Sequence, residues 1–142
     1  MLQWPRSGEE ATENMFQTTI ARDFPSDPHC LAEARRLVDD QRAISEDVRD
    51  SVKLGLTEIL ANAIRHARFV GDDRISVVIR ATETIVRVEV TDPGPCFDRG
   101  AVAARDLAEG GMGLRIVDEI ADRWSVDPKA GCCCVWFELR CA

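Results

Sequence analysis

The chain lacks an excess of positive charge and any long apolar run. Its 18 lysine and arginine residues stand against 25 aspartate and glutamate residues, which gives a net charge of −7. This balance argues against direct binding of nucleic acid or of an anionic membrane. We expect neither a signal peptide nor a membrane-spanning helix, because no apolar segment is long enough. We therefore interpret the chain as a cytoplasmic protein.

The chain also lacks a cysteine spacing that is typical of a zinc site or of a disulfide framework. Three of its six cysteines are consecutive, and the full set is Cys30, Cys96, Cys132, Cys133, Cys134 and Cys141. We expect reduced thiols, with the consecutive run filling a strand, because a free cysteine behaves as a small apolar side chain.

No repeat, interdomain linker or low-complexity segment divides the chain. Residues 1–14 are polar and are predicted to form a disordered N-terminal tail. Residues 15–142 are predicted to form a single domain, because a hydrophobic content of 45% is sufficient for one core.

Apolar periodicity predicts helices and strands that segregate along the chain. Helical spacing predicts helices over about 27–42, 45–68 and 110–122, with Asp27 and Ser45 as the N-caps of the first two. Alternation predicts strands over 16–24 and 132–140, and a hairpin over 75–90. We expect an α+β fold: a two-layer sandwich with a mostly antiparallel mixed sheet and helices on one face.

Two polar residues interrupt the apolar stripe of the second predicted helix. Glu58 and Asn62 stand four residues apart and therefore share a helix face, where buried polar groups without partners are costly. The side-chain oxygen of Asn62 suits Mg²⁺. Glu58 could orient or deprotonate a hydroxyl or water near that metal. A pair of hydrogen-bonded structural side chains is the alternative interpretation.

Two further motifs follow along the chain. Asp92 ends an apolar strand, and its carboxylate could accept a hydrogen bond from an exocyclic amine such as that of adenine. An ordinary Asp–Pro turn is the alternative at this position. The glycines Gly110, Gly111 and Gly113 precede the third predicted helix, where a helix N-terminus and a close backbone can bind phosphate.

In this order, the motifs resemble the GHKL (Bergerat-fold) ATP-binding superfamily. More closely, the chain resembles the anti-sigma factor serine/threonine kinases in the segments LTEILANAIRHA, VEVTDPGPCFD, GGMGLRIVDEIADRW and VWFEL. The resemblance covers about residues 16–139. It implies a protein kinase that uses ATP and Mg²⁺, sequesters a sigma factor and phosphorylates an anti-sigma factor antagonist on serine or threonine.

The resemblance also implies roles for the matching positions. Asn62 would hold Mg²⁺, and Glu58 would act as the catalytic base or as a water-positioning acid. Asp92 would bind the adenine amine, with Gly94 shaping that loop. The remaining nucleotide-binding residues would be Gly110, which allows lid movement, Gly111 and Gly113, which hold the phosphates, and Leu114. Residues 95–110 would form a mobile lid that closes over ATP.

Two cysteines depart from the family pattern. Cys96 stands where a glycine is common, and Cys133 stands near the position of a common threonine, so the departures bear on nucleotide affinity more than on the fold. One alternative function is a non-catalytic module that switches partners in response to nucleotide. A detached histidine kinase domain is the least favoured, because no helical hairpin carries a phosphoacceptor histidine. The family also leads us to expect a homodimer, with the edge strand at 16–24 as a candidate interface.

Overall fold

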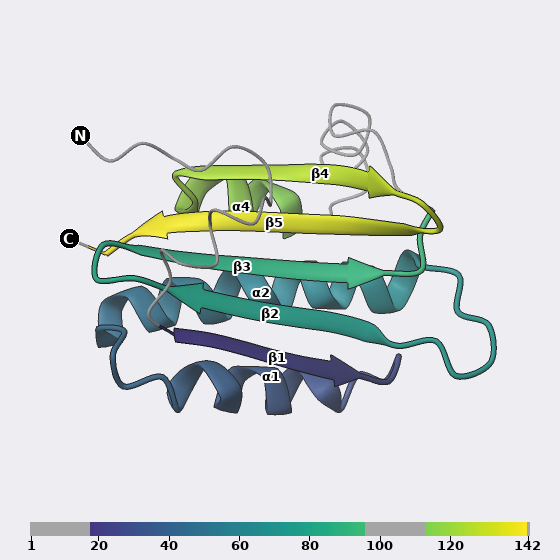
Figure 1. Ribbon diagram of the computed structural model, residues 1–142, viewed down its shortest axis with the longest axis horizontal. Helices are drawn as coiled ribbons and strands as arrows, with labels where there is room; N and C mark the ends of the chain where they lie inside the picture. The colour runs from purple at the N-terminus through teal and green to yellow at the C-terminus, as the bar shows by residue number, and fades with distance from the viewer. Residues whose placement is uncertain (1–17, 96–112, 142) are drawn as a thin grey trace.

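The computed structural model describes residues 18–95 and 113–141 (Figure 1). Five strands and three helices lie within these ranges. In chain order they are β1 (Thr18–Phe24), α1 (Cys30–Asp39), α2 (Glu46–His66), β2 (Ile75–Ala81), β3 (Ile85–Asp92), α4 (Gly113–Ile120), β4 (Arg123–Lys129) and β5 (Cys132–Arg140). None of these helices is long and apolar enough to cross a membrane.

The strands form one sheet in the order β1-β2-β3-β5-β4, with β1 and β4 at its edges. Every pairing between these strands is antiparallel. The three helices cover one face of the sheet, as Figure 1 shows. The predicted α+β sandwich is therefore confirmed.

The core lies between α2 and the face of the sheet that the helices cover. The strand register places Val88 between Ile79 of β2 and Phe137 of β5, and all three side chains are at most 2% exposed. Because side chains alternate across a strand, Val90 and Asp92 lie on the same face of β3 as Val88. Asp92 is thus a polar end to an otherwise apolar row.

The predicted hairpin is confirmed as β2 and β3. Thr82 closes the turn between them, because its Oγ1 accepts hydrogen bonds from the backbone N–H groups of Thr84 (3.1 Å) and Ile85 (3.0 Å). The first predicted strand is present as β1, although residues 16 and 17 lie outside the described ranges. The last predicted strand is present as β5.

The helix boundaries differ from the prediction at α1. Ser45 is the N-cap of α2, as predicted, but His29 rather than Asp27 precedes α1. The Asp27 carboxylate instead accepts a hydrogen bond from the backbone N–H of His29 (2.9 Å). Asp27 therefore closes a turn before the helix, which is a common local use of aspartate.

The strand β4 was not predicted. Its sequence contains Pro128, and a proline cannot donate a hydrogen bond to a neighbouring strand, which argues against a strand in the absence of other information. The proline is tolerated because β4 is an edge strand that pairs only with β5. Trp124 of β4 faces Phe137 and contributes to the core.

Gly55 allows α2 to approach the sheet closely. A Cβ atom at this position would lie 2.8 Å from Cζ of Phe137 and 3.0 Å from Cδ1 of Ile120. We expect Gly55→Val to lower the free energy of unfolding by about 1 to 3 kcal/mol through overpacking. Denaturant unfolding checks this value, with Leu54→Val on the exposed side of the same helix as the control. Equal stability of both variants would contradict the close approach.

The other face of the sheet carries a buried ion-pair network. Arg87 hydrogen-bonds through Nη1 to Oε1 of Glu138 and through Nε to Oε1 of Glu89 (2.8 Å). Its guanidinium also lies over the ring of Trp136, 4.1 Å from the ring centroid. Arg87 is 5% exposed and Glu138 is 1% exposed, so both charges are removed from water.

Candidate functional site

The two polar residues of the α2 stripe lie at the boundary of the core. Asn62 is 9% exposed, and Glu58 is half-buried. The Asn62 Oδ1 atom accepts a hydrogen bond from Nη2 of Arg65, one turn further along the helix. This bond is what the alternative interpretation expects of Asn62, namely a structural side chain with a hydrogen-bond partner. It also places a cation on the oxygen that the magnesium assignment requires.

Asp92 lies at the end of β3 and faces the helix layer. It is 9% exposed, and its Oδ1 atom accepts a hydrogen bond from the backbone N–H of Gly94 (2.6 Å). Burial raises the pKa of the Asp92 carboxyl above its ordinary value, and the Gly94 N–H opposes this shift. Gly94 has a φ of 79°, a backbone conformation that glycine adopts at no steric cost.

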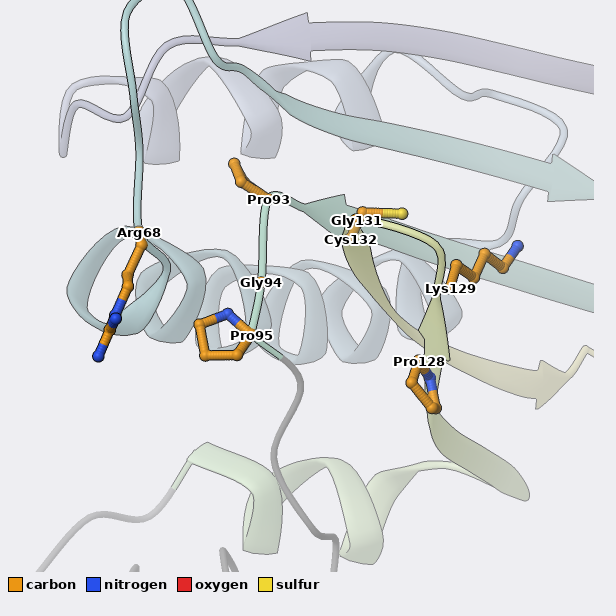
Figure 2. Close-up of a pocket in the computed structure, with 8 residues that line it drawn as sticks. All are labelled: Arg68, Pro93, Gly94, Pro95, Pro128, Lys129, Gly131 and Cys132. Atoms are coloured by element: carbon orange, nitrogen blue, oxygen red, sulfur yellow. The ribbon is translucent and has the colours of Figure 1, made fainter.

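A backbone hydrogen bond attaches the turn after β3 to the end of α2. The N–H of Arg68 donates to the carbonyl oxygen of Gly94 (2.9 Å). Figure 2 shows Gly94 and Pro95 beside the end of this helix, with Arg68 next to them. Asp92 and Asn62, which are 30 positions apart in the sequence, therefore lie on segments that meet at one end of α2. No pattern in the sequence indicates this attachment, because any residue except proline can supply the N–H.

Two pockets open beside this turn. The first has a volume of about 340 Å³ and is lined by the turn and by the β4–β5 connection, including Gly94, Lys129 and Cys132. The second has a volume of about 410 Å³, includes Asp92 and shares Arg68 with the first. Neither pocket includes Glu58 or Asn62 in its lining. The described pockets therefore lie beside the Asp92–Gly94 turn rather than beside Glu58 and Asn62.

The predicted phosphate-binding residues lie partly outside the described ranges. Gly110 and Gly111 are outside them, as are residues 96–110 of the predicted lid. Gly113 begins α4, and the Leu114 side chain is buried in the core. The roles of all four residues in nucleotide binding stay predictions, as do those of Glu58, Asn62, Asp92 and Gly94.

The cysteines differ from the expectation of reduced thiols at one position. Cys133 is disulfide-bonded, so that expectation is wrong for this residue. The other described cysteines, Cys30, Cys132, Cys134 and Cys141, are free. The chain's remaining cysteine, Cys96, lies outside the described residues. Cys133 is opposite Asp92 in the strand register, which places the disulfide beside the candidate adenine site.

We expect reductant to destabilise the protein through this disulfide. Loss of a disulfide lowers the free energy of unfolding by about 2 to 4 kcal/mol, in large part because the unfolded chain gains freedom. Thermal unfolding with and without dithiothreitol measures the effect. Cys133→Ser should unfold identically in both conditions, whereas the neighbouring Cys134→Ser should keep the wild-type response to reductant. A wild-type protein that is insensitive to reductant would contradict the expectation.

The described residues fit a magnesium nucleotide. The second carboxylate oxygen of Asp92, Oδ2, accepts no hydrogen bond from the described residues and so leaves an acceptor for an exocyclic amine. Asn62 supplies a hard side-chain oxygen, and Glu58 supplies a carboxylate one helical turn earlier. Mg²⁺ usually binds one or two protein oxygens together with phosphates and water, which agrees with this small set.

Two solved structures are similar to this chain. A structure of the RsbU and RsbW domains of Rv1364c from Mycobacterium tuberculosis has a TM-score of 0.65 and 15% identity, and the match covers 87% of this chain and 32% of that chain. The histidine kinase AdeS of Acinetobacter baumannii has a TM-score of 0.49 and 16% identity, with 91% and 71% of the two chains covered. This chain thus spans about a third of the mycobacterial one. No curated protein matches significantly.

The family assignment follows from the sequence match rather than from these structural similarities. The model of the histidine kinase-like ATPase domain matches residues 24–139, which include every strand and helix of the described fold except most of β1 and the end of β5. This chain belongs to the family of histidine kinase-like ATPase domains.

Proposed function

We propose that the protein binds Mg-ATP and acts as an anti-sigma factor and serine/threonine kinase. It would sequester a sigma factor in the cytoplasm and phosphorylate an anti-sigma factor antagonist. The observation that carries the nucleotide-binding part is the attachment of the Asp92–Gly94 turn to the end of α2. The family membership supports ATP binding, and the structural similarity to a chain that contains an RsbW domain supports the regulatory part.

Each part of the candidate site has a distinct task in this proposal. Asp92 selects adenine, because its Oδ2 atom accepts from the exocyclic amine while Oδ1 stays bonded to Gly94. Asn62 holds Mg²⁺ beside the phosphates. Glu58, half-buried on the same helix face, orients the attacking hydroxyl and receives its proton, as a general base must. When bound at Asn62, Mg²⁺ would supply positive charge that stabilises the transferred phosphoryl group.

Phosphorylation of the antagonist provides the switch. A phosphoserine or phosphothreonine carries a charge of about −1.5 to −2 at neutral pH. This charge, added at an interface with an acidic protein of net charge −7, favours dissociation of the antagonist. The kinase would then be available to bind its sigma factor.

A non-catalytic module that switches partners in response to nucleotide is the second candidate. The disulfide at Cys133 favours it, because a covalent bond stands opposite Asp92 where the family commonly has a hydroxyl. The presence of Glu58 favours phosphoryl transfer instead. Both candidate functions include nucleotide binding, and only the kinase transfers a phosphoryl group.

A homodimer is also part of the proposal. The strand β1 is an edge of the sheet, so its outer backbone groups can pair with a second chain. The strand at 16–24 is the candidate interface expected from the sequence, and this interface stays a proposal. Light scattering on the wild-type protein over a range of concentrations would test for a dimer. A chain that stays monomeric at every concentration would exclude the homodimer.

Phosphate transfer from labelled ATP to candidate antagonist proteins separates the two candidate functions. We expect Glu58→Gln to lower the transfer rate by about 10²-fold or more, the usual contribution of a general base. Because Glu58 does not contact the adenine in this proposal, the variant should bind Mg-ATP within a few-fold of the wild type. Nucleotide binding without transfer to any cognate antagonist would favour the non-catalytic module.

A further inference from the structure

Arg65 occupies the oxygen on which the magnesium assignment depends. Its guanidinium donates from Nη2 to Oδ1 of Asn62 across one turn of α2. Asn62 is 9% exposed, whereas the Arg65 side chain is exposed. Among the described residues, Arg65 is the only hydrogen-bond partner of the Asn62 side chain. An exposed cation thus hydrogen-bonds a largely buried oxygen.

Arg65 and Mg²⁺ disfavour each other at the Oδ1 atom of Asn62. Both are cations, and two like charges within several ångströms repel each other unless the site is strongly screened. The Asn62 oxygen has two lone pairs, so the guanidinium leaves one of them for a metal, but it crowds the short, nearly octahedral geometry that Mg²⁺ prefers. Binding of the metal at Asn62 is therefore favoured when Arg65 moves away from Oδ1.

When nucleotide binds, its phosphate oxygens offer the exposed Arg65 side chain a second hydrogen-bond partner. A guanidinium binds phosphate oxygens in a planar, often bidentate geometry, and charge assistance makes such bonds strong. A triphosphate that arrives with Mg²⁺ offers these oxygens next to Asn62. Free Mg²⁺ offers none, so it cannot compensate for the lost Arg65–Asn62 bond.

We propose that Arg65 is a positioning residue that competes with Mg²⁺ for Asn62 and so makes metal binding depend on nucleotide. The inference rests on the proposed function, because it assumes that Asn62 holds the metal of Mg-ATP. It adds one feature to that function: Arg65 in the last turn of α2 disfavours binding of free Mg²⁺ and permits binding of Mg²⁺ together with the triphosphate.

A simpler role for Arg65 would be to stabilise the helix. A cation in the last turn interacts favourably with the C-terminal end of a helix, and α2 has both Arg65 and His66 there. That role predicts an effect of Arg65 on unfolding but no effect on the dependence of nucleotide affinity on Mg²⁺. The metal dependence is therefore the measurement that separates the two roles.

The experiment titrates a fluorescent ATP analogue into the protein over a range of Mg²⁺ concentrations. The quantity of interest is the Mg²⁺ concentration at half of the maximal gain in nucleotide affinity. We expect Arg65→Gln to lower this midpoint by about tenfold, because the variant removes one cation beside the metal. Arg35→Gln, which makes the same charge change on an exposed position of α1, should leave the midpoint unchanged.

A second pair of variants tests whether the effect passes through Asn62. In an Asn62→Ala background, Arg65→Gln should not shift the midpoint, because the shared oxygen is gone. An equal midpoint for wild type and Arg65→Gln, or a shift that persists without Asn62, would overturn the inference. If the folded wild type bound no nucleotide at any Mg²⁺ concentration, the proposed function would fail first, and the inference with it.

Discussion

Asp92→Asn is expected to weaken ATP binding by about 10- to 150-fold, which corresponds to the 1.5 to 3 kcal/mol of a hydrogen bond to a charged group. In the wild type, Oδ1 of Asp92 accepts from the Gly94 N–H and leaves Oδ2 for the adenine amine. Asparagine has one oxygen and one amide nitrogen. If its oxygen still accepts the hydrogen bond from the Gly94 N–H, its NH₂ group faces the adenine amine. Both groups are hydrogen-bond donors, so no bond forms between them.

The same substitution should not destabilise the protein in the absence of nucleotide. Burial raises the pKa of the Asp92 carboxyl above its ordinary value of 3.8, so the folded state binds this proton more tightly than the unfolded state does. Wild-type stability therefore falls as the pH rises from 3.8 through the raised pKa, and the charged form is the less stable one at neutral pH. Asparagine does not ionise, so the variant avoids this loss of stability at neutral pH, and its side-chain oxygen can still accept the hydrogen bond from Gly94.

Calorimetric titration with ATP and thermal unfolding at pH 7 measure the two effects separately. Asp50→Asn, at an exposed position of α2, is the matched control and should change neither affinity nor the adenine preference. Unchanged ATP affinity in a folded Asp92→Asn protein would refute the adenine assignment. A lower melting temperature of that variant would refute the argument from burial.

Arg87→Met is expected to lower the free energy of unfolding by about 3 to 5 kcal/mol, the range for breaking a buried ion pair from one side. Glu138 is 1% exposed, and Arg87 is the partner of its Oε1 atom. The Oε2 atom has no hydrogen-bond partner among the described residues, and Nη1 of Arg123 lies 4.0 Å from it. Removal of the guanidinium therefore leaves a buried carboxylate with one distant cation.

Two further measurements identify the carboxylate as the cause. The double variant Arg87→Met/Glu138→Leu should recover most of the lost stability, because an apolar pair of similar volume replaces a buried ion pair at little cost. Burial already raises the pKa of Glu138, and Arg87 opposes that shift. Without Arg87, the stability deficit should grow as the pH rises through the raised pKa and shrink toward low pH. A deficit that is independent of pH would contradict this explanation.

Most of the fold could be predicted from local patterns in the sequence. The alternation of Val86, Val88 and Val90 identified β3, and the turn signal at residues 82–84 identified the hairpin. Ser45 identified the start of α2. These features are local, so the residues that specify them are close together in the sequence. The unpredicted strand β4 depends instead on its place at the edge of the sheet, where Pro128 is tolerated.

The candidate site was less accessible to sequence reasoning, because its geometry depends on distant contacts. The residue types at Asn62 and Asp92 suggested a ligand, but nothing in the sequence placed the Gly94 carbonyl on the Arg68 N–H. The Arg65–Asn62 hydrogen bond is local, at a spacing of three residues, and helical spacing could have suggested it. The disulfide at Cys133 was missed because no regular cysteine spacing accompanies it.

Binding of ATP to the wild-type protein, with Mg²⁺ and with a chelator, tests the central claim most directly. Titration calorimetry with Asn62→Ala alongside measures it. We predict saturable binding by the wild type that Mg²⁺ strengthens, and binding by Asn62→Ala that Mg²⁺ no longer strengthens. Failure of the folded wild type to bind ATP, or an undiminished effect of Mg²⁺ on Asn62→Ala, would contradict a magnesium nucleotide site at the end of α2.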